Sequence, residues 1–285
     1  MAITAQQVNE LRKKTGAGMM DCKKALTETN GDMEKAIEVL RKKGAAVAAK
    51  RAERSANEGL VITKISDDKK FGSIAEINCE TDFVAKNDDF VALANEVIES
   101  AFENKADSVE VLFEKKPGLK NKVTELLGKI GEKIEVSRVA SESAANGILV
   151  DYIHMGSKLG VLIKFENVTG AEDDLYKLGK DFAMQVAAMN PISVYREEIP
   201  KETIEKEIEI YKELARKEGK PDNILDKIAT GKLNKFYQEN CLSEQTFIKD
   251  NSKSVGDMIK EFNKTHSSDV KISLFHRFHL GDEKK

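Results

Sequence analysis

Two stretches of the chain repeat one pattern. The segment GLVITKISDDKKFGSIAEIN (residues 59–78) aligns without a gap on GILVDYIHMGSKLGVLIKFE (residues 147–166), with Gly59 on Gly147 and Gly72 on Gly160. In both copies apolar residues alternate with polar or small ones on either side of a turn, which is typical of a β-hairpin. An internal repeat of this kind restricts the fold to two subdomains of similar architecture.

The sequence around each copy completes the pattern. A helical segment with an Asp-Phe pair follows each hairpin, DDFVALANEV in the first copy and KDFAMQVAAM in the second, and we expect each helix to open there. A further strand ends each copy, EKIEVSRVA and VKISLFHRF. The predicted fold class is therefore α+β, with two repeated core subdomains of antiparallel sheet and helix.

The first 54 residues have a different pattern. Gly16 and Gly31 separate three short helical segments, and Thr4 with Gln7 forms a capping-box pattern at the first. The apolar positions expected to close a small core are Val8, Leu11, Leu26, Ala36, Ile37 and Leu40. Twelve basic and seven acidic residues give this part a charge of +5, against −8 for the remainder. The run AAVAAKRAERSANEG (residues 45–59), which begins within this part, fits either a linker or an exposed helix.

An insertion interrupts the second copy. Heptad-like spacing relates Ile204, Ile208, Tyr211 and Ala215. The sequence GKP at 219–221 then turns the chain, and apolar residues continue on a returning helix. This pattern predicts a projecting helical hairpin. The expected domains are 1–54 (three helices with linker), 55–140 (core subdomain N), 141–200 (first part of core subdomain C), 201–240 (coiled-coil hairpin) and 241–285 (second part of core subdomain C).

The segment NCETDFVAKND (residues 78–88) lies between the first hairpin and its helix, for which Asp88 or Asp89 is the expected N-cap. We expect a strand-to-helix loop here, and loops held by rigid elements frequently carry binding residues. Phe83 stands in this loop between acidic and polar neighbours. Its position alone favours a side chain folded back into the core, and a binding role is the alternative.

Patterns of catalytic or metal-ligating residues are missing from the sequence. Cys22, Cys79 and Cys241 are odd in number and far apart, and we interpret them as reduced thiols in a cytosol. GAGMMDCKK lacks the spacing of a phosphate-binding loop. A thiol hydrolase using Cys79 is a remote alternative, and we expect no enzyme, no cofactor and no metal site.

Charge and hydropathy limit the partners and the location. The 46 basic and 49 acidic residues nearly balance, which argues against direct nucleic-acid binding. The start of the chain has no apolar signal region, and no stretch approaches the ~20 apolar residues of a membrane span. We expect a cytoplasmic protein without membrane contact. An RNA- or ribosome-associated module that uses the basic N-terminal part is the alternative function.

Four stretches together resemble the elongation factor Ts family: LRKKTGAGMMDCKKALTETNGD, NCETDFVAKND, YIHMGSKLGVL and AMQVAAMNP. The resemblance implies a ubiquitin-associated-like three-helix N-terminal domain, two repeated core subdomains, and a coiled-coil hairpin used in dimerisation. It also implies a guanine nucleotide exchange factor of bacterial translation. The implied partner is the GTPase elongation factor Tu, in its GDP-bound and nucleotide-free forms.

The resemblance further implies which residues contact the GTPase. The segment that enters it near the Mg²⁺ site comprises Thr81, Asp82, Phe83 and Val84, with Asp82 and Phe83 as the intruding side chains. A GTPase of this class holds its nucleotide through backbone amides, a lysine and a bridging Mg²⁺, so disturbing that site loosens GDP.

Secondary contacts with the GTPase are also implied by the resemblance. These are His154 on the second hairpin tip and Met19, Met20 and Lys23 of the N-terminal domain. For the two methionines, packing in the small helical core is the alternative. Many family members continue beyond the last strand with a further module, so the contact made by that module is expected to be missing here.

Overall fold

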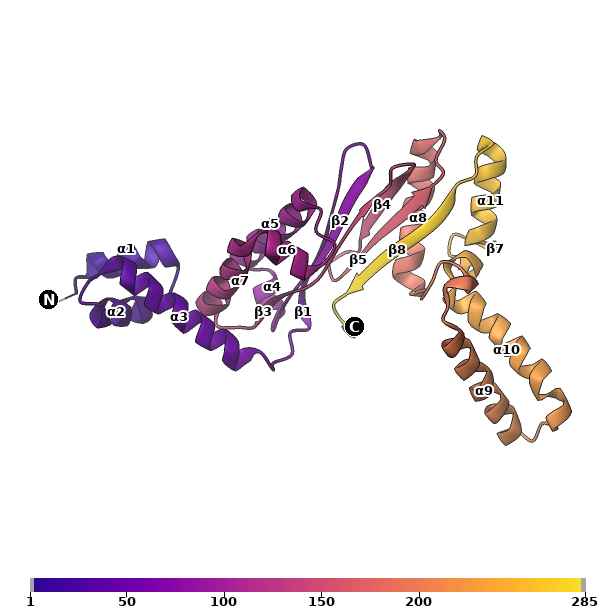
Figure 1. The fold of residues 1–285 in the computed structure, drawn as a ribbon, viewed down its shortest axis with the longest axis horizontal. Helices are drawn as coiled ribbons and strands as arrows, with labels where there is room; N and C mark the ends of the chain where they lie inside the picture. The colour runs from indigo at the N-terminus through magenta and orange to yellow at the C-terminus, as the bar shows by residue number, and fades with distance from the viewer. Residues whose placement is uncertain (1–2, 283–285) are drawn as a thin grey trace.

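The computed structural model describes residues 3–282 as an elongated molecule with helices at one end, two sheets in the middle and a helical hairpin at the other end (Figure 1). Residues 1–2 and 283–285 of the predicted first and last domains lie outside the described residues. The mixture of helices and small antiparallel sheets in the described chain agrees with the predicted α+β class.

The N-terminal helices are α1 (Ala5–Thr15), α2 (Met19–Glu28) and α3 (Met33–Arg51). The predicted capping box is present at Thr4, and Gly16 ends α1 in the left-handed region at φ 67°. Predicted apolar residues form the core of this part: Val8, Leu11, Leu26 and Ala36 are buried, and Ile37 and Leu40 pack against them half-buried. Of the run 45–59 that fitted either a linker or an exposed helix, residues 45–51 belong to α3 and residues 52–57 lie outside helix and strand.

The first sheet has the strand order β1-β2-β3 and is antiparallel. Its strands are β1 (Glu58–Ile65), β2 (Phe71–Cys79) and β3 (Ile134–Ser143). The helices between β2 and β3 cover one face (Figure 1): α4 (Asp82–Ala85), α5 (Asp88–Asn104), α6 (Val109–Lys115) and α7 (Pro117–Ile130). The predicted cap of α5 at Asp88 or Asp89 is wrong: the cap is Asn87, whose amide oxygen accepts a hydrogen bond from the Asp89 N–H.

The second sheet has the order β4-β5-β8 and is also antiparallel. Its strands are β4 (Gly147–Ile153), β5 (Leu159–Glu166) and β8 (Lys271–His279), and its helices are α8 (Glu172–Met189) and α11 (Val255–His266). The prediction that the second helix opens at Asp181–Phe182 is wrong. The buried stripe through Phe182 already begins at Leu175, so the apolar period extends the helix toward its N-terminus.

The predicted insertion forms the helical hairpin α9 (Lys201–Lys217) and α10 (Leu225–Asn240). An apolar cluster at the base of this hairpin consists of Ile199, Ile204, Leu233, Phe236, Tyr237 and Cys241. Short elements surround it: the 3₁₀ turns η1 (Arg196–Glu198), η2 (Asp222–Ile224) and η3 (Leu242–Glu244), and the strands β6 (Thr246–Phe247) and β7 (Asp250–Ser254).

The two hairpins of the repeat are equivalent in detail. Gly72 pairs with Ile65 in the first, and Gly160 pairs with Ile153 in the second. The third strand of each sheet joins with a register shift, between Glu76 and Ile77 in one copy and at the aligned pair Lys164/Phe165 in the other. The sequence repeat is therefore a structural repeat down to the position of the irregularity.

The two sheets meet through reciprocal contacts. The Val61 N–H donates to the Ser157 carbonyl at 2.7 Å, and the aligned Leu149 N–H donates to the aligned Lys69 carbonyl at 2.8 Å. Between them lies a shared apolar cluster that includes the aligned pairs Val61 with Leu149 and Ile74 with Leu162. Each hairpin thus meets the other with the same surface, as in a two-fold contact between identical subunits.

We expect Gly160→Ala to destabilise the protein by about 1–3 kcal/mol, because the two sheets leave no room for a side chain there. A Cβ at Gly160 would lie 2.6 Å from Val61 Cγ1 and 2.8 Å from Ile153 Cδ1. Urea unfolding measures the change. The matched control is Gly231→Ala in α10, where a Cβ meets nothing within 4 Å, so helix propensity should stabilise by about 1 kcal/mol. Equal unfolding midpoints for Gly160→Ala and the wild type would contradict this packing.

Candidate functional site

The segment after β2 contains a single helical turn, α4, so the prediction of a strand-to-helix loop is only partly right. Thr81 is its N-cap, with an extended backbone and a side-chain oxygen that accepts from the Val84 N–H at 3.4 Å. Asp82 places its negative charge in the first turn, where backbone N–H groups point outward. The Thr-Asp pair therefore explains why the chain turns here before α5 begins.

Phe83 points into solvent, whereas the two residues that follow it do not. The Phe83 residue is 82% exposed, whereas Val84 and Ala85 are buried in the core under the first sheet. The interpretation that Phe83 folds into the core is therefore wrong. Of the four residues predicted to meet a partner, Asp82 and Phe83 present their side chains, while Thr81 and Val84 hold the turn in place.

Glu132, at the start of the connection from α7 to β3, anchors Thr81. Its carboxylate accepts the Thr81 N–H at 3.1 Å and the Thr81 hydroxyl at 2.9 Å. The buried Cys79 thiol donates to the Thr81 carbonyl at 3.2 Å. Burial, with the nearby Glu132 and Glu58 carboxylates, raises the pKa of that thiol to about 12. A thiol of this kind stays protonated, which removes the thiol hydrolase alternative.

Glu80 receives three donors from two different elements. Arg51 Nη1 at the end of α3 lies at 2.7 Å, Arg54 Nη1 just beyond the helix at 3.1 Å, and the Lys133 N–H donates at 2.6 Å. Burial of the carboxyl alone would raise its pKa, but the hydrogen bonds from Lys133, Arg51 and Arg54 outweigh it and lower the pKa to about 2. The residue next to the exposed turn is thus a fixed negative charge at neutral pH.

The Asp82 carboxylate is charged and only weakly engaged. It accepts a hydrogen bond from the Lys86 ammonium at 2.8 Å, which together with the charges of Lys86 and Lys158 lowers its pKa. The Lys86 and Asp82 side chains are 76% and 47% exposed, and exposed pairs of this type contribute little stability. Asp82 can therefore exchange Lys86 for another partner at small cost.

His154 lies at the exposed tip between β4 and β5. Its Nδ1 is 2.9 Å from the Tyr152 hydroxyl, and the neighbouring Met155 is 91% exposed. Lys158 of the same tip forms an ion pair with Glu58 on β1 at 2.6 Å, and its charge reaches Asp82. The structure thus brings this tip and α4 to one side of the molecule. Met155 was missed from the sequence, although an apolar residue in a polar turn was a visible signal.

Met19, Met20 and Lys23 share the exposed face of α2. Met19 is 52% and Met20 is 73% exposed, whereas the core of the three helices takes Cys22, Ala25 and Leu26 from the opposite face. Core packing of the two methionines is therefore wrong. A pair of exposed methionines is a flexible apolar surface suited to a protein partner.

Comparison with known proteins identifies the family. The model of the family described as elongation factor TS matches residues 80–282. Elongation factor Ts of Chlorobaculum parvum is 49% identical, with 98% of this chain and 99% of the relative covered. The chain belongs to the elongation factor Ts family. Elongation factor Ts of Chlorobaculum tepidum is also 49% identical over 98% of this chain, and that of Clostridium botulinum is 46% identical over 99% of this chain and 94% of its own length.

The match to the elongation factor Ts family includes most of the predicted contacts. It begins at Glu80 and so covers α4 and the tip with His154. Met19, Met20 and Lys23 precede that range, but the relatives align over nearly the whole chain. The exposed face of α2 therefore lies in a part of the chain that these elongation factors share.

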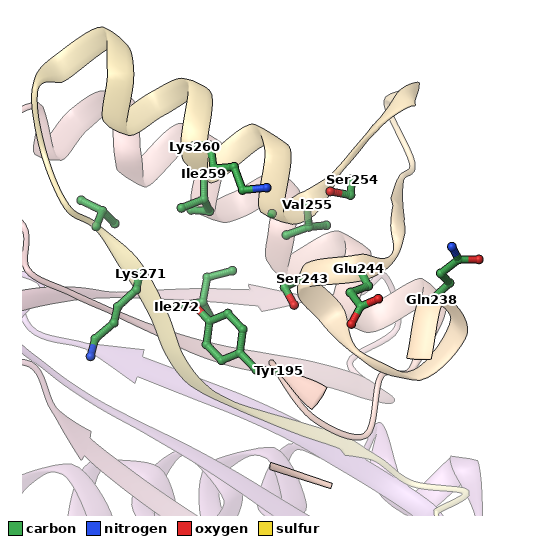
Figure 2. Close-up of a pocket in the computed structure, with 12 residues that line it drawn as sticks. Tyr195, Gln238, Ser243, Glu244, Ser254, Val255, Ile259, Lys260, Lys271 and Ile272 are labelled. Carbon is green, nitrogen blue, oxygen red and sulfur yellow. The ribbon is translucent and has the colours of Figure 1, made fainter. Parts of the chain in front are cut away.

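A separate cavity of about 460 Å³ lies between α11, the start of β8 and residues 243–244. Figure 2 shows its side chains spread over these elements, with Lys260 and Lys271 pointing away from each other in this view. The Ser254 hydroxyl caps α11 and the Glu244 carboxylate pairs with Arg196. These polar groups are thus already engaged in holding the fold.

Among residues 3–282, no cluster of His, Cys, Asp and Glu side chains is arranged to hold a metal ion. Each helix of the described chain is too short or too polar to cross a bilayer.

We expect Glu80→Gln to destabilise the protein by about 1–3 kcal/mol at neutral pH, since the amide keeps an acceptor for Lys133 but loses the charge that pairs two arginines. The Glu80 pKa is depressed in the folded state, so this contribution is present above about 4.5 and is lost as pH falls toward about 2. Urea unfolding of both proteins in this pH range measures it. A gap that stays constant down to the lowest pH would contradict the charge pairing.

Proposed function

We propose that this chain is a guanine nucleotide exchange factor that binds elongation factor Tu in its GDP form, disturbs the Mg²⁺ and phosphate site, and promotes GDP release during translation elongation. Family membership supports the function, and translation is the basis for a cytoplasmic location. The observation that supports the mechanism is Phe83, which stands in solvent on a turn that Thr81, Val84 and Ala85 hold in place.

Phe83 and Asp82 act together as a wedge. A free Phe83 gains about 1.5–3 kcal/mol when a partner buries it, and this gain is realised only in a conformation of the GTPase that opens a pocket for it. Asp82 brings a negative charge next to a site that holds Mg²⁺ and phosphate. The pair thus favours the GTPase conformation with displaced metal over the one that binds GDP tightly.

One wedge does not account for large acceleration. Each tenfold loosening of nucleotide needs about 1.4 kcal/mol of coupling, so burying Phe83 supplies roughly ten- to a hundredfold. Further coupling comes from His154 at the second tip, and the docking of α2 adds affinity for the GTPase. Because coupling is reciprocal, returning nucleotide expels the factor by the same ratio. Covalent bonds are neither made nor broken in this chain, so it is not an enzyme in the chemical sense.

The division of labour follows the predicted domains. Residues 1–54 form a ubiquitin-associated-like docking arm that presents Met19, Met20 and Lys23. Residues 55–140 carry the wedge, and residues 141–200 with 241–285 carry the His154 tip. Support comes from the separate apolar cluster in each of these parts.

Residues 201–240 form a coiled-coil hairpin that we assign to homodimerisation. On α9, Ile210 is 48% and Leu214 is 43% exposed, although the helix already packs against α10. A second copy of the hairpin would cover these side chains. Sedimentation equilibrium over a range of concentrations tests the assignment, and a monomer throughout would rule it out.

The wedge is tested by Asp82→Ala with Phe83→Ala. Both side chains are outside the core, so the double variant should melt like the wild type while slowing GDP release from elongation factor Tu at least tenfold. Stopped-flow fluorescence of labelled GDP measures the rate. Asp67→Ala with Ile192→Ala removes one exposed acid and one exposed apolar side chain elsewhere and should leave release unchanged. Wild-type release from the wedge variant would sink the proposed role of α4.

The docking arm is tested by Met19→Ala with Met20→Ala. Loss of an apolar anchor should raise the concentration of factor that gives half-maximal release about tenfold or more, while the plateau rate stays within about twofold because the wedge is intact. The control is Met189→Ala with Ile192→Ala, which removes two similarly exposed side chains. A plateau equal to spontaneous release would mean that the arm takes part in the displacement itself.

A further inference from the structure

Helix α3 connects the docking arm to the first subdomain. Its first half carries Ala36 of the arm's core, and its last residue is Arg51. Nineteen residues of helix span about 28 Å, so one rigid element reaches from the three-helix core to the side of the wedge (Figure 1). Of the two expectations for the run 45–59, the helix therefore describes residues 45–51.

In the middle of its length α3 crosses α7 at close range. A Cβ on Gly128 would lie 2.9 Å from the Gly44 Cα, and a Cβ on Gly44 would lie 3.4 Å from the Thr124 carbonyl oxygen. Arg41 on α3 pairs with Glu125 on α7 at 3.0 Å. Two facing glycines allow the backbones to approach and fix where along α7 the crossing occurs.

The arm also touches α7 through its first turn. A Cβ on Gly16 would lie 2.9 Å from Cε of Lys129, and the Lys129 ammonium bonds Asp89 on α5 at 2.7 Å. The arm therefore rests on the first subdomain at two places, the α3 crossing and the α1–α2 turn.

The far end of α3 reaches the residue that precedes the wedge turn. Arg51 and, just beyond the helix, Arg54 donate to both oxygens of Glu80, whose side chain is 16% exposed. Glu80 is followed directly by Thr81, which caps α4. The Lys133 ammonium in turn donates to the Arg54 carbonyl at 3.1 Å. Arginines from the arm's helix and the turn after α7 thus hold Glu80 from two sides.

We propose that α3 is a strut and that Arg51, Arg54 and Glu80 are positioning residues, which hold the exposed face of α2 in a fixed relation to the wedge so that both surfaces reach the GTPase together. This inference rests on the proposed function. A rigid connection makes the second contact intramolecular once the first has formed, which raises its effective concentration. If the strut is loosened, the exposed face of α2 and the wedge both remain intact, but they no longer keep a fixed distance and orientation relative to each other.

The test compares Arg51→Ala with Arg54→Ala against a charge-matched control on the same helix, Lys42→Ala with Lys50→Ala, whose side chains are exposed. GDP release from elongation factor Tu is titrated with each protein. The strut variant should raise the half-saturating concentration about fivefold with a plateau within about twofold of wild type, and Glu80→Gln should do the same. Arg51→Lys with Arg54→Lys keeps the cations and should recover most of the loss. The control should match the wild type.

Combination with the arm variant separates positioning from local support. If the strut delivers the arm's contribution, adding Arg51→Ala and Arg54→Ala to Met19→Ala and Met20→Ala should cost nothing further. If the combined variant instead has a lower plateau rate of GDP release than the arm variant alone, Glu80 only shapes the turn, and the strut proposal is overturned. A strut variant indistinguishable from its control would overturn it as well.

A distance measurement tests the strut without any partner. Spin labels at Glu28→Cys on α2 and Glu110→Cys on α6 report how the arm lies on the first subdomain, and the native cysteines are buried. The distance distribution should be narrow in the wild type and in the Lys42/Lys50 control and broader in the strut variant. Equal widths would overturn the proposal. If the wild type fails to accelerate GDP release, the proposed function fails, and the spin-label distances alone decide the strut.

Discussion

The contact between the two sheets is the interaction on which the rest of the structure depends. Val61, Ile74, Leu149 and Leu162 pack in one buried cluster, and reciprocal backbone hydrogen bonds join each hairpin tip to the other sheet. The Thr63 hydroxyl completes the contact by donating to Asp151, its own counterpart in the repeat, at 2.7 Å. The α4 turn follows a strand of the first sheet and the His154 tip joins two strands of the second, so this contact sets the relative positions of these two surfaces.

The proposed function depends on a burial free energy that the free protein does not gain, that of the Phe83 side chain. An 82% exposed phenylalanine contributes nothing to folding in solution, yet the turn that carries it is tied by Glu132, by the Cys79 thiol and by the buried Val84. Rigid support for an exposed apolar side chain reduces the entropy that binding would otherwise lose. The free energy of burying Phe83 therefore remains available for a conformational change in a partner.

The ion pairs of Glu80 join the basic N-terminal part of the chain to the acidic remainder. The N-terminal part carries +5 and the remainder −8, and Arg51 and Arg54 meet an acidic residue of the first subdomain at the boundary between them. Arg41 with Glu125 repeats this arrangement at the α3 crossing. Some of the basic residues of the N-terminal part are thus paired with acidic residues of the same molecule, which weakens the argument that this part binds a nucleic acid.

The sequence by itself determined the local pattern: the repeat, the helical hairpin, the capping box at Thr4 and the third strand of each sheet could all be predicted, because turn residues and apolar periods act over short distances. The Asp-Phe pair misplaced the start of α8, since a polar first turn hides the apolar stripe that begins at Leu175. Only the tertiary structure decided that Phe83 is exposed, because its surroundings depend on Val84 and Ala85 filling the space beneath α4. The pairing of Glu80 with Arg51 could not be predicted either, since the two residues meet only after α3 has crossed α7.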